Sequence, residues 1–292
     1  MSGAAQSPEL EALATSVQED IDALRPTRIF AEGDQGVALS LPDAYRVQAV
    51  TARLRKLRGE ELAGFKIGCT SAAVQKAFGV SQPVRGYIWQ GQRSQSGAEL
   101  SHAMYRKPAV EGEVAVYVVD SSAPDVLDWV VEWAPVIEMH HFLWDNPAGG
   151  TANEIVCRNA IHCGIVEAAA TEGRPRGLLR NLPAEAVCTV HVNGAVVGAQ
   201  PLTELPGGPQ GTVRWLCEQL EAAAGSAAAV EGTGGGGEAI SIAQQAAEEA
   251  QFVRAPGTVI LASSPCSLYF VKPGDEVLVT CVGMEVRCVM VA

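Results

Sequence analysis

The sequence predicts an α+β protein with a mixed β-sheet, helices on its flanks and a helical segment at the N-terminus. Three observations lead to this fold class. Apolar residues recur at helical spacing over residues 7–24 and 41–57. Residues 114–119, VAVYVV, are rich in β-branched and small apolar residues, which is typical of a buried strand. Residues 257–292 have the composition of strands and turns throughout.

The elements before the central strand follow from local signals. Ser7 is suited to cap the first helix, and the second opens with a proline and an aspartate. In residues 64–70, GFKIGCT, apolar and other residues alternate, which predicts a strand with Lys66 on the face opposite its apolar neighbours. The alternative is an exposed strand lysine. Ser71 then caps a short helix that ends at Gly79.

Two glutamates stand at the start of the central strand. Because successive side chains of a strand point to opposite faces, Glu111 and Glu113 share one face beside an apolar core. Two like charges there are costly unless a cation neutralises them. Glu138, in the strand-like piece 136–139, adds a third carboxylate. Three carboxylates without a thiolate suit Mg²⁺ or Mn²⁺; the alternative is the solvated face of a half-buried sheet.

The segment that leads to Glu138 is expected to be an amphipathic helix. It covers residues 124–134 and begins at Pro124, a residue suited to a first helical turn. His140 and His141 follow directly after the third acid. A histidine beside a metal-binding carboxylate acts as a general base or as an outer-shell partner. The alternative is a hydrogen-bonded core or interface histidine.

The C-terminal half contains a hairpin, a helix and an insertion. The Asn-Gly pair at 193–194 between β-rich flanks predicts a hairpin, and residues 205–220 form a Gly/Pro loop and an amphipathic helix. Residues 221–250 are Ala-rich and contain four consecutive glycines. They are interpreted as a low-complexity insertion, flexible around 224–238, with a short helix at 239–250. The glycines lack the strand and the Lys-Ser/Thr of a phosphate loop.

The composition and charge are those of an ordinary soluble globular protein. Of the 292 residues, 48% are hydrophobic and 18% are charged. The net charge of −12 disfavours nucleic acid and anionic membranes as partners. No apolar run approaches the roughly 20 residues that span a bilayer, and the N-terminus lacks the pattern of a signal or transit peptide. We therefore expect a cytoplasmic protein.

The eight cysteines are scattered without a Cys-x-x-Cys pair and lie mostly in apolar contexts. This pattern favours reduced, buried thiols over a disulfide framework. Cys69 and Cys266 are the candidates for reactive thiols, although a structural role is the commoner interpretation of such residues.

Several segments carry a family resemblance. In chain order they are 64–89, 107–119 (KPAVEGEVAVYVV), 136–141 (VIEMHH), 158–164 (RNAIHCG), 192–199, 205–220 and 271–286. Together they resemble the fumarylacetoacetate hydrolase superfamily, and in particular its 2-hydroxypenta-2,4-dienoate hydratase and 4-oxalocrotonate decarboxylase branch. The resemblance implies a mixed β-roll, like the C-terminal domain of that superfamily, with flanking helices and a helical N-terminal cap. Residues 1–60 would form the cap, and residues 61–292 the metal-binding catalytic domain with the insertion.

The resemblance also implies roles for particular residues. The three glutamates would hold Mg²⁺ or Mn²⁺, and Lys66 would bind substrate oxygen or move protons. His140 and His162 are the other catalytic candidates, and His162 is similar to a position that holds Ser or His across the branch. Ser263 and Ser264 stand near the family's Thr-Gly strand end and are candidates for substrate binding.

Two departures from the family pattern place arginine near or at a position where an acid is usual. Pro83 is followed by Val84 and Arg85 instead of Asp and Phe, and Arg158 precedes Asn159 where the family has Asp-Asn-Ala. Arg85, Arg158 and Asn159 are therefore candidates for substrate binding, with a charge preference that differs from that of the family.

The expected function is that of a divalent-metal-dependent lyase, a hydratase or decarboxylase, acting on a small 2-oxo or 2-hydroxy-dienoic acid through a metal-stabilised enolate. One alternative is a C–C bond hydrolase of acylpyruvate type. Another is a catalytically altered relative that serves as an assembly or regulatory subunit, which the two arginines would fit. The resemblance further implies a small-molecule 2-oxo acid as the partner and a homo-oligomer.

Overall fold

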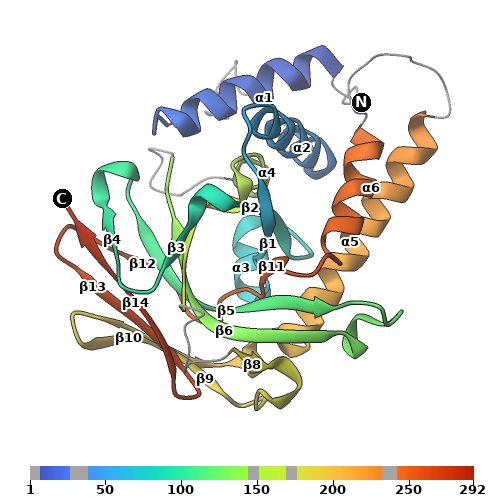
Figure 1. Ribbon diagram of the computed structural model, residues 1–292. Coiled ribbons are helices and arrows are strands. Elements are labelled where there is room, and N and C mark those ends of the chain that lie inside the picture. The colour runs from blue at the N-terminus through green and yellow to red at the C-terminus, as the bar shows by residue number, and fades with distance from the viewer. Residues whose placement is uncertain (1–6, 27–38, 144–150, 169–175, 232–241) are drawn as a thin grey trace.

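The computed structural model describes residues 7–26, 39–143, 151–168, 176–231 and 242–292. In these residues the chain forms two β-sheets with helices around them (Figure 1). The observed combination of helices and a mixed sheet confirms the α+β class.

The larger sheet has the order β2-β1-β11-β5-β6-β7-β3, with β12 paired to β5 and β8 paired to β6. It curls into a half-barrel (Figure 1), with the long antiparallel pair β5 and β6 near its centre. Its strands are β1 (Leu62–Gly68), β2 (Val84–Trp89), β3 (Arg93–Gln95), β5 (Ala109–Asp120), β6 (Val130–His140), β7 (His162–Glu167), β8 (Gly177–Leu178), β11 (Val259–Leu261) and β12 (Tyr269–Phe270).

The smaller sheet has the order β10-β9-β13-β14-β4 and packs against the outer face of β5 and β6. Its strands are β4 (Ala98–Ser101), β9 (Val187–Val192), β10 (Ala195–Pro201), β13 (Glu276–Cys281) and β14 (Met284–Val291). The two sheets meet closely at Gly112, where a Cβ would lie 2.6 Å from the side chain of Val190. A glycine is therefore needed at this point of β5 for the sheets to pack at this distance.

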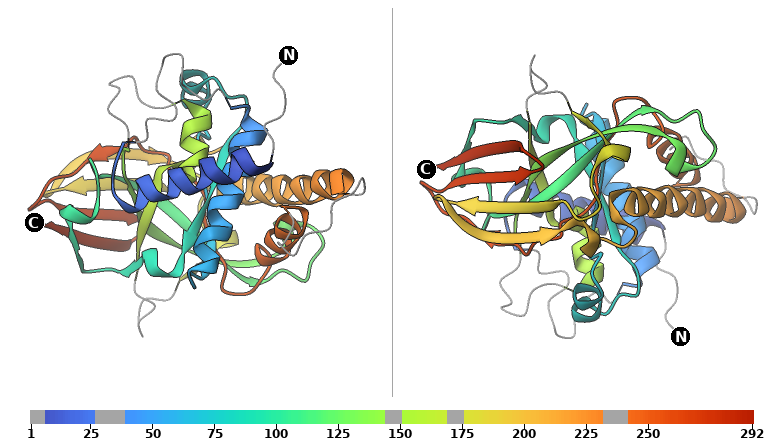
Figure 2. Two further views of the ribbon diagram at one scale, coloured as in Figure 1. Left: turned by 90° about the horizontal axis from the view of Figure 1, so that it is seen from above. Right: turned by 90° about the horizontal axis from the view of Figure 1, so that it is seen from below.

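Five of the six α-helices in the described residues lie in two groups. The six are α1 (Ser7–Asp22), α2 (Leu41–Leu57), α3 (Ala72–Phe78), α4 (Ala152–Cys157), α5 (Gly208–Glu231) and α6 (Ile242–Phe252). Helices α1, α2 and α4 share a small apolar core with the start of β2, which includes Val17, Val47, Val84 and Ile155. Helices α5 and α6 pack side by side (Figures 1 and 2). Among the described residues no helix is long and apolar enough to cross a membrane.

Several local predictions are confirmed. The helix over residues 41–57 has the predicted bounds. Ser71 caps α3, and Gly79, in the left-handed conformation with a φ of 68°, ends it. Asn193 and Gly194 connect β9 and β10 with φ values of 51° and 78°, as a tight hairpin turn with two left-handed residues requires.

The helix predicted over residues 124–134 is wrong. The chain makes a single 3₁₀ turn, Val126–Asp128, and strand β6 begins at Val130. Most of this strand is buried on both faces, with Trp133 on one face and Ala134 on the other. A strand with apolar side chains on both faces gives the same closely spaced apolar run as the buried stripe of a helix.

The flexible stretch predicted around 224–238 is wrong as far as Glu231, because α5 continues to that residue. Alanine has the highest helix propensity, so the Ala-rich run extends the helix. The short helix predicted at 239–250 is confirmed as α6, with bounds Ile242–Phe252. The glycine run falls within residues 232–241, outside the described residues.

The eight cysteines are free thiols, and all are buried except Cys69 and Cys163, which are partly exposed. Cys266 donates its thiol hydrogen to the carbonyl of Cys188 at 3.5 Å. Burial raises the pKa of Cys69, although the charge of Lys66 opposes this shift. The raised pKa favours a structural role for Cys69, whereas the hydrogen bond with Cys188 lowers the pKa of Cys266.

Candidate metal centre

Strands β5 and β6 bring the three glutamates together. Antiparallel pairing places Glu111 opposite Glu138, and Glu113 follows Glu111 on the same face of β5. Glu113 and Glu138 are fully buried, whereas Glu111 is partly exposed. The structure thus places the three acids that the sequence analysis named on one face of the β5–β6 pair, while their role as metal ligands stays a prediction.

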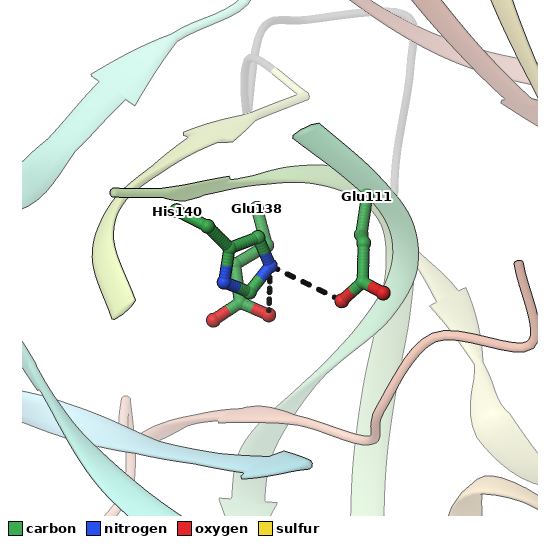
Figure 3. A group of neighbouring side chains, drawn as sticks. All are labelled: Glu111, Glu138 and His140. Carbon is green, nitrogen blue, oxygen red and sulfur yellow. Dashed lines mark hydrogen bonds and ion pairs between the residues drawn. The ribbon is translucent and has the colours of Figure 1, made fainter. Parts of the chain in front are cut away.

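His140, at the end of β6, forms a cluster with two of these acids. Its Nε2 atom lies 3.1 Å from Oε2 of Glu111 and 3.3 Å from Oε2 of Glu138 (Figure 3). One potential ligand atom from each of the three residues lies within 4.8 Å of the others. In the part of the chain that the structure describes, no other group of three His, Cys, Asp or Glu side chains is arranged in this way.

The second oxygen of Glu138 contacts two further side chains. Oε1 lies 2.7 Å from Nδ1 of His162 on β7 and 3.3 Å from Nζ of Lys66 on β1. Lys66 is buried, so the alternative of an exposed strand lysine is wrong. The three catalytic candidates, Lys66, His140 and His162, therefore all contact the same carboxylate.

The protonation of the cluster follows from burial and from these contacts. Burial alone would raise the pKa of Glu138, but the charges of His140 and Lys66 and two histidine hydrogen bonds hold it well below its usual value. Burial would lower the pKa of Lys66, yet the surrounding glutamates raise it. Burial, reinforced by the charges of Glu138 and Glu111, raises the pKa of Glu113 well above its usual value.

Buried carboxyl oxygens without hydrogen bonds indicate that the acids could bind a divalent cation. Neither carboxyl oxygen of Glu113 has a hydrogen-bond partner among the described residues, although the side chain is completely buried. Buried carboxyl oxygens are normally hydrogen-bonded, paired or bound to a metal. A hard or borderline divalent ion would satisfy these oxygens together with the carboxylate of Glu111.

An unusual turn positions His162. Asn159, Ala160 and Ile161 have φ values of 56°, 51° and 59°, three consecutive left-handed residues without a glycine. Each costs roughly 1–2 kcal/mol relative to the right-handed region. Such strain persists only where the surroundings hold it. Here Gly86 permits the approach, because a Cβ on it would lie 2.6 Å from the carbonyl oxygen of Asn159.

The two arginines have partners away from the acid cluster. Arg85 lies on β2 with its guanidinium 3.7 Å from Glu249 of α6 and stacked over the ring of Tyr45. Arg158 pairs with Glu154 at 2.9 Å, one turn earlier along the chain. Neither ion pair involves an acid of the cluster, and a role of the two arginines in substrate binding stays a prediction.

The remaining predicted substrate-binding residues make contacts within the protein. The hydroxyl of Ser263 lies 2.9 Å from that of Thr70, and Ser264 donates to the carbonyl of Gly112 or Cys266. Asn159 uses both ends of its amide on the main chain of β2. Ser264 and Asn159 thus hold main-chain groups, while Ser263 bonds to another side chain, and a role of the three in substrate binding stays a prediction.

The sequence analysis missed two residues: Val84, close to the predicted site, and Glu249, the partner of Arg85. Val84 and Lys66 both lie beside Gly68, where a Cβ would be 3.1 Å from the Lys66 ammonium and 3.8 Å from a Val84 methyl. The sequence pattern marks Val84 only as the replacement of an acid, whereas in the structure it belongs to the apolar core shared with α1, α2 and α4. Glu249, the partner of Arg85, lies in the segment interpreted as low complexity. The spacing of Gln245 and Glu249, one helical turn apart, could have indicated that the two side chains lie on one face of a helix and bond to each other.

A curled mixed sheet with a buried carboxylate cluster beside a lysine defines a class of metal-dependent enzymes, and comparisons with known proteins identify the family. No protein-family model matches the chain. The chain is 30% identical over 222 residues to 2-hydroxyhexa-2,4-dienoate hydratase of Comamonas testosteroni, which covers 72% of this chain and 81% of the relative. A 2-keto-4-pentenoate hydratase of Burkholderia vietnamiensis is 41% identical over 73 residues, 25% of this chain and 28% of the relative.

The fold is similar to that of 4-oxalocrotonate decarboxylase from Pseudomonas putida G7. Its structure with magnesium and adipate has a TM-score of 0.78 and 19% identity, and the match covers 99% of this chain and 100% of that one. The structure of the same enzyme with calcium and acetate has a TM-score of 0.75. The chain belongs to the fumarylacetoacetate hydrolase superfamily, in the branch of the 2-hydroxydienoate hydratases and 4-oxalocrotonate decarboxylases.

Proposed function

We propose that the protein is a divalent-metal-dependent lyase, a hydratase or decarboxylase, that acts on a small 2-oxo or 2-hydroxy-dienoic acid. The observation that carries this proposal is the grouping of Glu111, Glu138 and His140, whose potential ligand atoms lie within 4.8 Å of one another, beside the Lys66 ammonium and with the buried Glu113 next along the same face of β5. The hydratase activity of the relative that matches over most of its length supports the same reaction class.

The three glutamates would hold the ion, Mg²⁺ or Mn²⁺. When bound, such an ion supplies Lewis-acid polarisation of a 2-oxo acid and stabilises the negative charge that develops during reaction. The unpartnered oxygens of Glu113 and the partly exposed carboxylate of Glu111 leave this side of the cluster available to a cation.

Lys66 would bind a substrate oxygen or transfer a proton. Its ammonium is kept charged by the surrounding glutamates, of which Glu138 lies at 3.3 Å. A buried ammonium with one close carboxylate partner can donate hydrogen bonds to a developing oxyanion. His162 would orient Glu138 through its Nδ1 atom, and His140 would handle protons or the ion at the other oxygen.

The alternatives receive less support. The case for an inert assembly subunit used arginines at positions 85 and 158, but their partners are Glu249 and Glu154. These arginines therefore add no ion pair to the acid cluster. A C–C hydrolase of acylpyruvate type would share the metal-binding acids, and the 2-hydroxyhexa-2,4-dienoate hydratase match favours the lyase over it.

The finer architecture belongs to the same proposal. Helices α1 and α2, within residues 1–60, would form a cap over the catalytic β-roll of residues 61–292. Their shared apolar core with β2 and α4 supports this arrangement. A homo-oligomeric, cytoplasmic enzyme remains our expectation from the family resemblance.

A substrate screen tests the proposed function. Metal-free protein is assayed with 2-oxo and 2-hydroxy-dienoic acids, with and without Mg²⁺ or Mn²⁺, and ultraviolet loss of the chromophore is followed separately from CO₂ release. We expect turnover that needs the ion and is lost in Glu138→Gln. An intact protein that binds neither ion in calorimetry and turns over none of these acids would instead favour the assembly subunit.

A further inference from the structure

We propose that His140 is a direct ligand of the bound ion and that the site therefore prefers a first-row transition ion such as Mn²⁺ to Mg²⁺. This assignment rests on the proposed function, in which the same acid cluster holds a divalent cation. It gives His140 a definite role in place of the general base or outer-shell partner that the sequence indicated.

The spacing of the three side chains is that of ligands around one ion. Nε2 of His140 lies 3.1 Å from a Glu111 oxygen and 3.3 Å from a Glu138 oxygen (Figure 3). Ligand atoms at neighbouring corners of an octahedron with bonds of about 2.1 Å lie about 3 Å apart. A cation bound by the two carboxylates would thus meet the imidazole without any rearrangement of the strands.

The backbone fixes His140 in this position. The residue is buried at the end of β6, paired with Ala109 of β5 on one side and His162 of β7 on the other. The β6–β7 register shifts between Met139 and His140. Such an irregularity re-aims the side chain that follows it. The imidazole and the Glu138 carboxylate consequently converge, and both belong to one rigid strand.

The donor set determines which ion is favoured. Carboxylate oxygens alone suit Mg²⁺, Ca²⁺ and Mn²⁺, whereas imidazole nitrogen suits transition ions. Three carboxylates with one imidazole form a mixed oxygen and nitrogen set, in which Mg²⁺ gains little from the nitrogen. If His140 contacted the ion only through water, the two ions would not be distinguished in this way.

Metal titrations of the full chain test the selectivity. Metal-free wild type and His140→Ala are titrated with Mn²⁺ and with Mg²⁺ by calorimetry. We expect the variant to lose about tenfold or more in Mn²⁺ affinity, with a smaller loss for Mg²⁺. Equal losses for both ions would overturn the assignment. His191→Gln, a histidine on β9 in the smaller sheet, is the control that should leave both affinities unchanged.

Pulsed electron paramagnetic resonance of the Mn²⁺-loaded protein tests the bond itself. We expect coupling to a directly bound nitrogen in wild type that changes with ¹⁵N-histidine labelling, persists in His141→Gln and disappears in His140→Gln. The isotope comparison needs no variant, so it holds even if a substitution impairs folding. Bound Mn²⁺ without nitrogen coupling overturns the His140 assignment alone. Protein that binds no divalent ion overturns the proposed function as well.

Discussion

The side-chain amide of Asn159 pairs with both main-chain groups of Tyr87. Its Oδ1 accepts from the Tyr87 N–H at 2.6 Å, and its Nδ2 donates to the Tyr87 carbonyl at 2.8 Å. This pair holds the first residue of the left-handed turn that ends at His162. The geometry of the acid cluster thus depends on a residue whose amide is directed at strand β2.

Two substitutions of Asn159 distinguish the effect of its left-handed backbone from the effect of its side-chain hydrogen bonds. Asn159→Gly relieves the left-handed backbone and removes the amide pair, whereas Asn159→Ala removes the pair and keeps the strain. We expect both variants to lower kcat with little change in KM, because His162 loses its fixed position. Steady-state kinetics check this. A raised KM with normal kcat would support the substrate contact predicted from the sequence.

Lys66→Met should reduce the rate far more than it reduces metal affinity. The substitution keeps most of the side-chain volume and removes the ammonium 3.3 Å from Glu138. Loss of a proton donor of this kind costs typically about 10²–10⁴ in rate. Turnover and metal titration on the same preparation check the prediction. A metal-affinity loss that exceeds the rate loss would argue against a substrate role.

Glu113→Gln should remove metal binding and stabilise the metal-free protein at neutral pH. Burial and neighbouring acids raise the pKa of Glu113 in the folded state. Its contribution to stability is therefore greatest below the unfolded pKa and is lost as pH rises through the folded pKa. Chemical denaturation with and without Mn²⁺ measures both effects, with the exposed Glu99→Gln as control. A variant that keeps wild-type metal affinity would contradict the ligand role.

His141 should make the protein sensitive to mild acid. Burial, with the charges of His162 and Arg158, lowers the pKa of His141 from 6.5 to about 3. Stability from this group is present above the unfolded pKa and falls as pH drops toward 3, by up to about 1.4 kcal/mol per pH unit. Denaturation midpoints between pH 4 and 7 should fall less steeply in His141→Gln. Parallel curves would refute this.

Arg85→Met should destabilise the protein by about 3 kcal/mol, because it leaves Glu249 buried without its cation. The carboxylate would keep its hydrogen bonds from Tyr87 and Gln245. The double variant Arg85→Met, Glu249→Leu should regain most of the loss. Denaturant unfolding checks both. A KM that rises in Arg85→Met without loss of stability would restore the substrate-binding role predicted from sequence.

Much of the local structure could be predicted from the sequence, because its signals are local. Ser71 and Gly79 delimit a helix through capping chemistry, and Asn193 with Gly194 sets a turn. The alternation of Glu111 and Glu113 on one face follows from the pleat of a strand. These features need only neighbours within a few residues.

The features that the sequence did not predict depend on tertiary contacts. The run that ends at Ala134 is a strand because β5 and β8 pair with this part of β6, and no property of the run itself distinguishes it from a helix. Arg85 pairs with Glu249, which lies in a different segment of the chain, and this long-range partner has no local signal at Arg85. The left-handed Ile161 carries no signal, since a β-branched residue is disfavoured in that conformation.

Glu111 and Glu138 occupy paired positions on two adjacent strands. They cannot move apart unless the hydrogen bonds between β5 and β6, in the middle of the half-barrel, are broken. Of the two, only the Glu111 carboxylate reaches solvent, with 17% of its side chain exposed. A cation would therefore enter and leave when the Glu111 side chain rotates, while the strands beneath it stay in place. Retention of the ion is then a matter of side-chain kinetics, and new ion preferences can arise by single substitutions that leave the scaffold untouched.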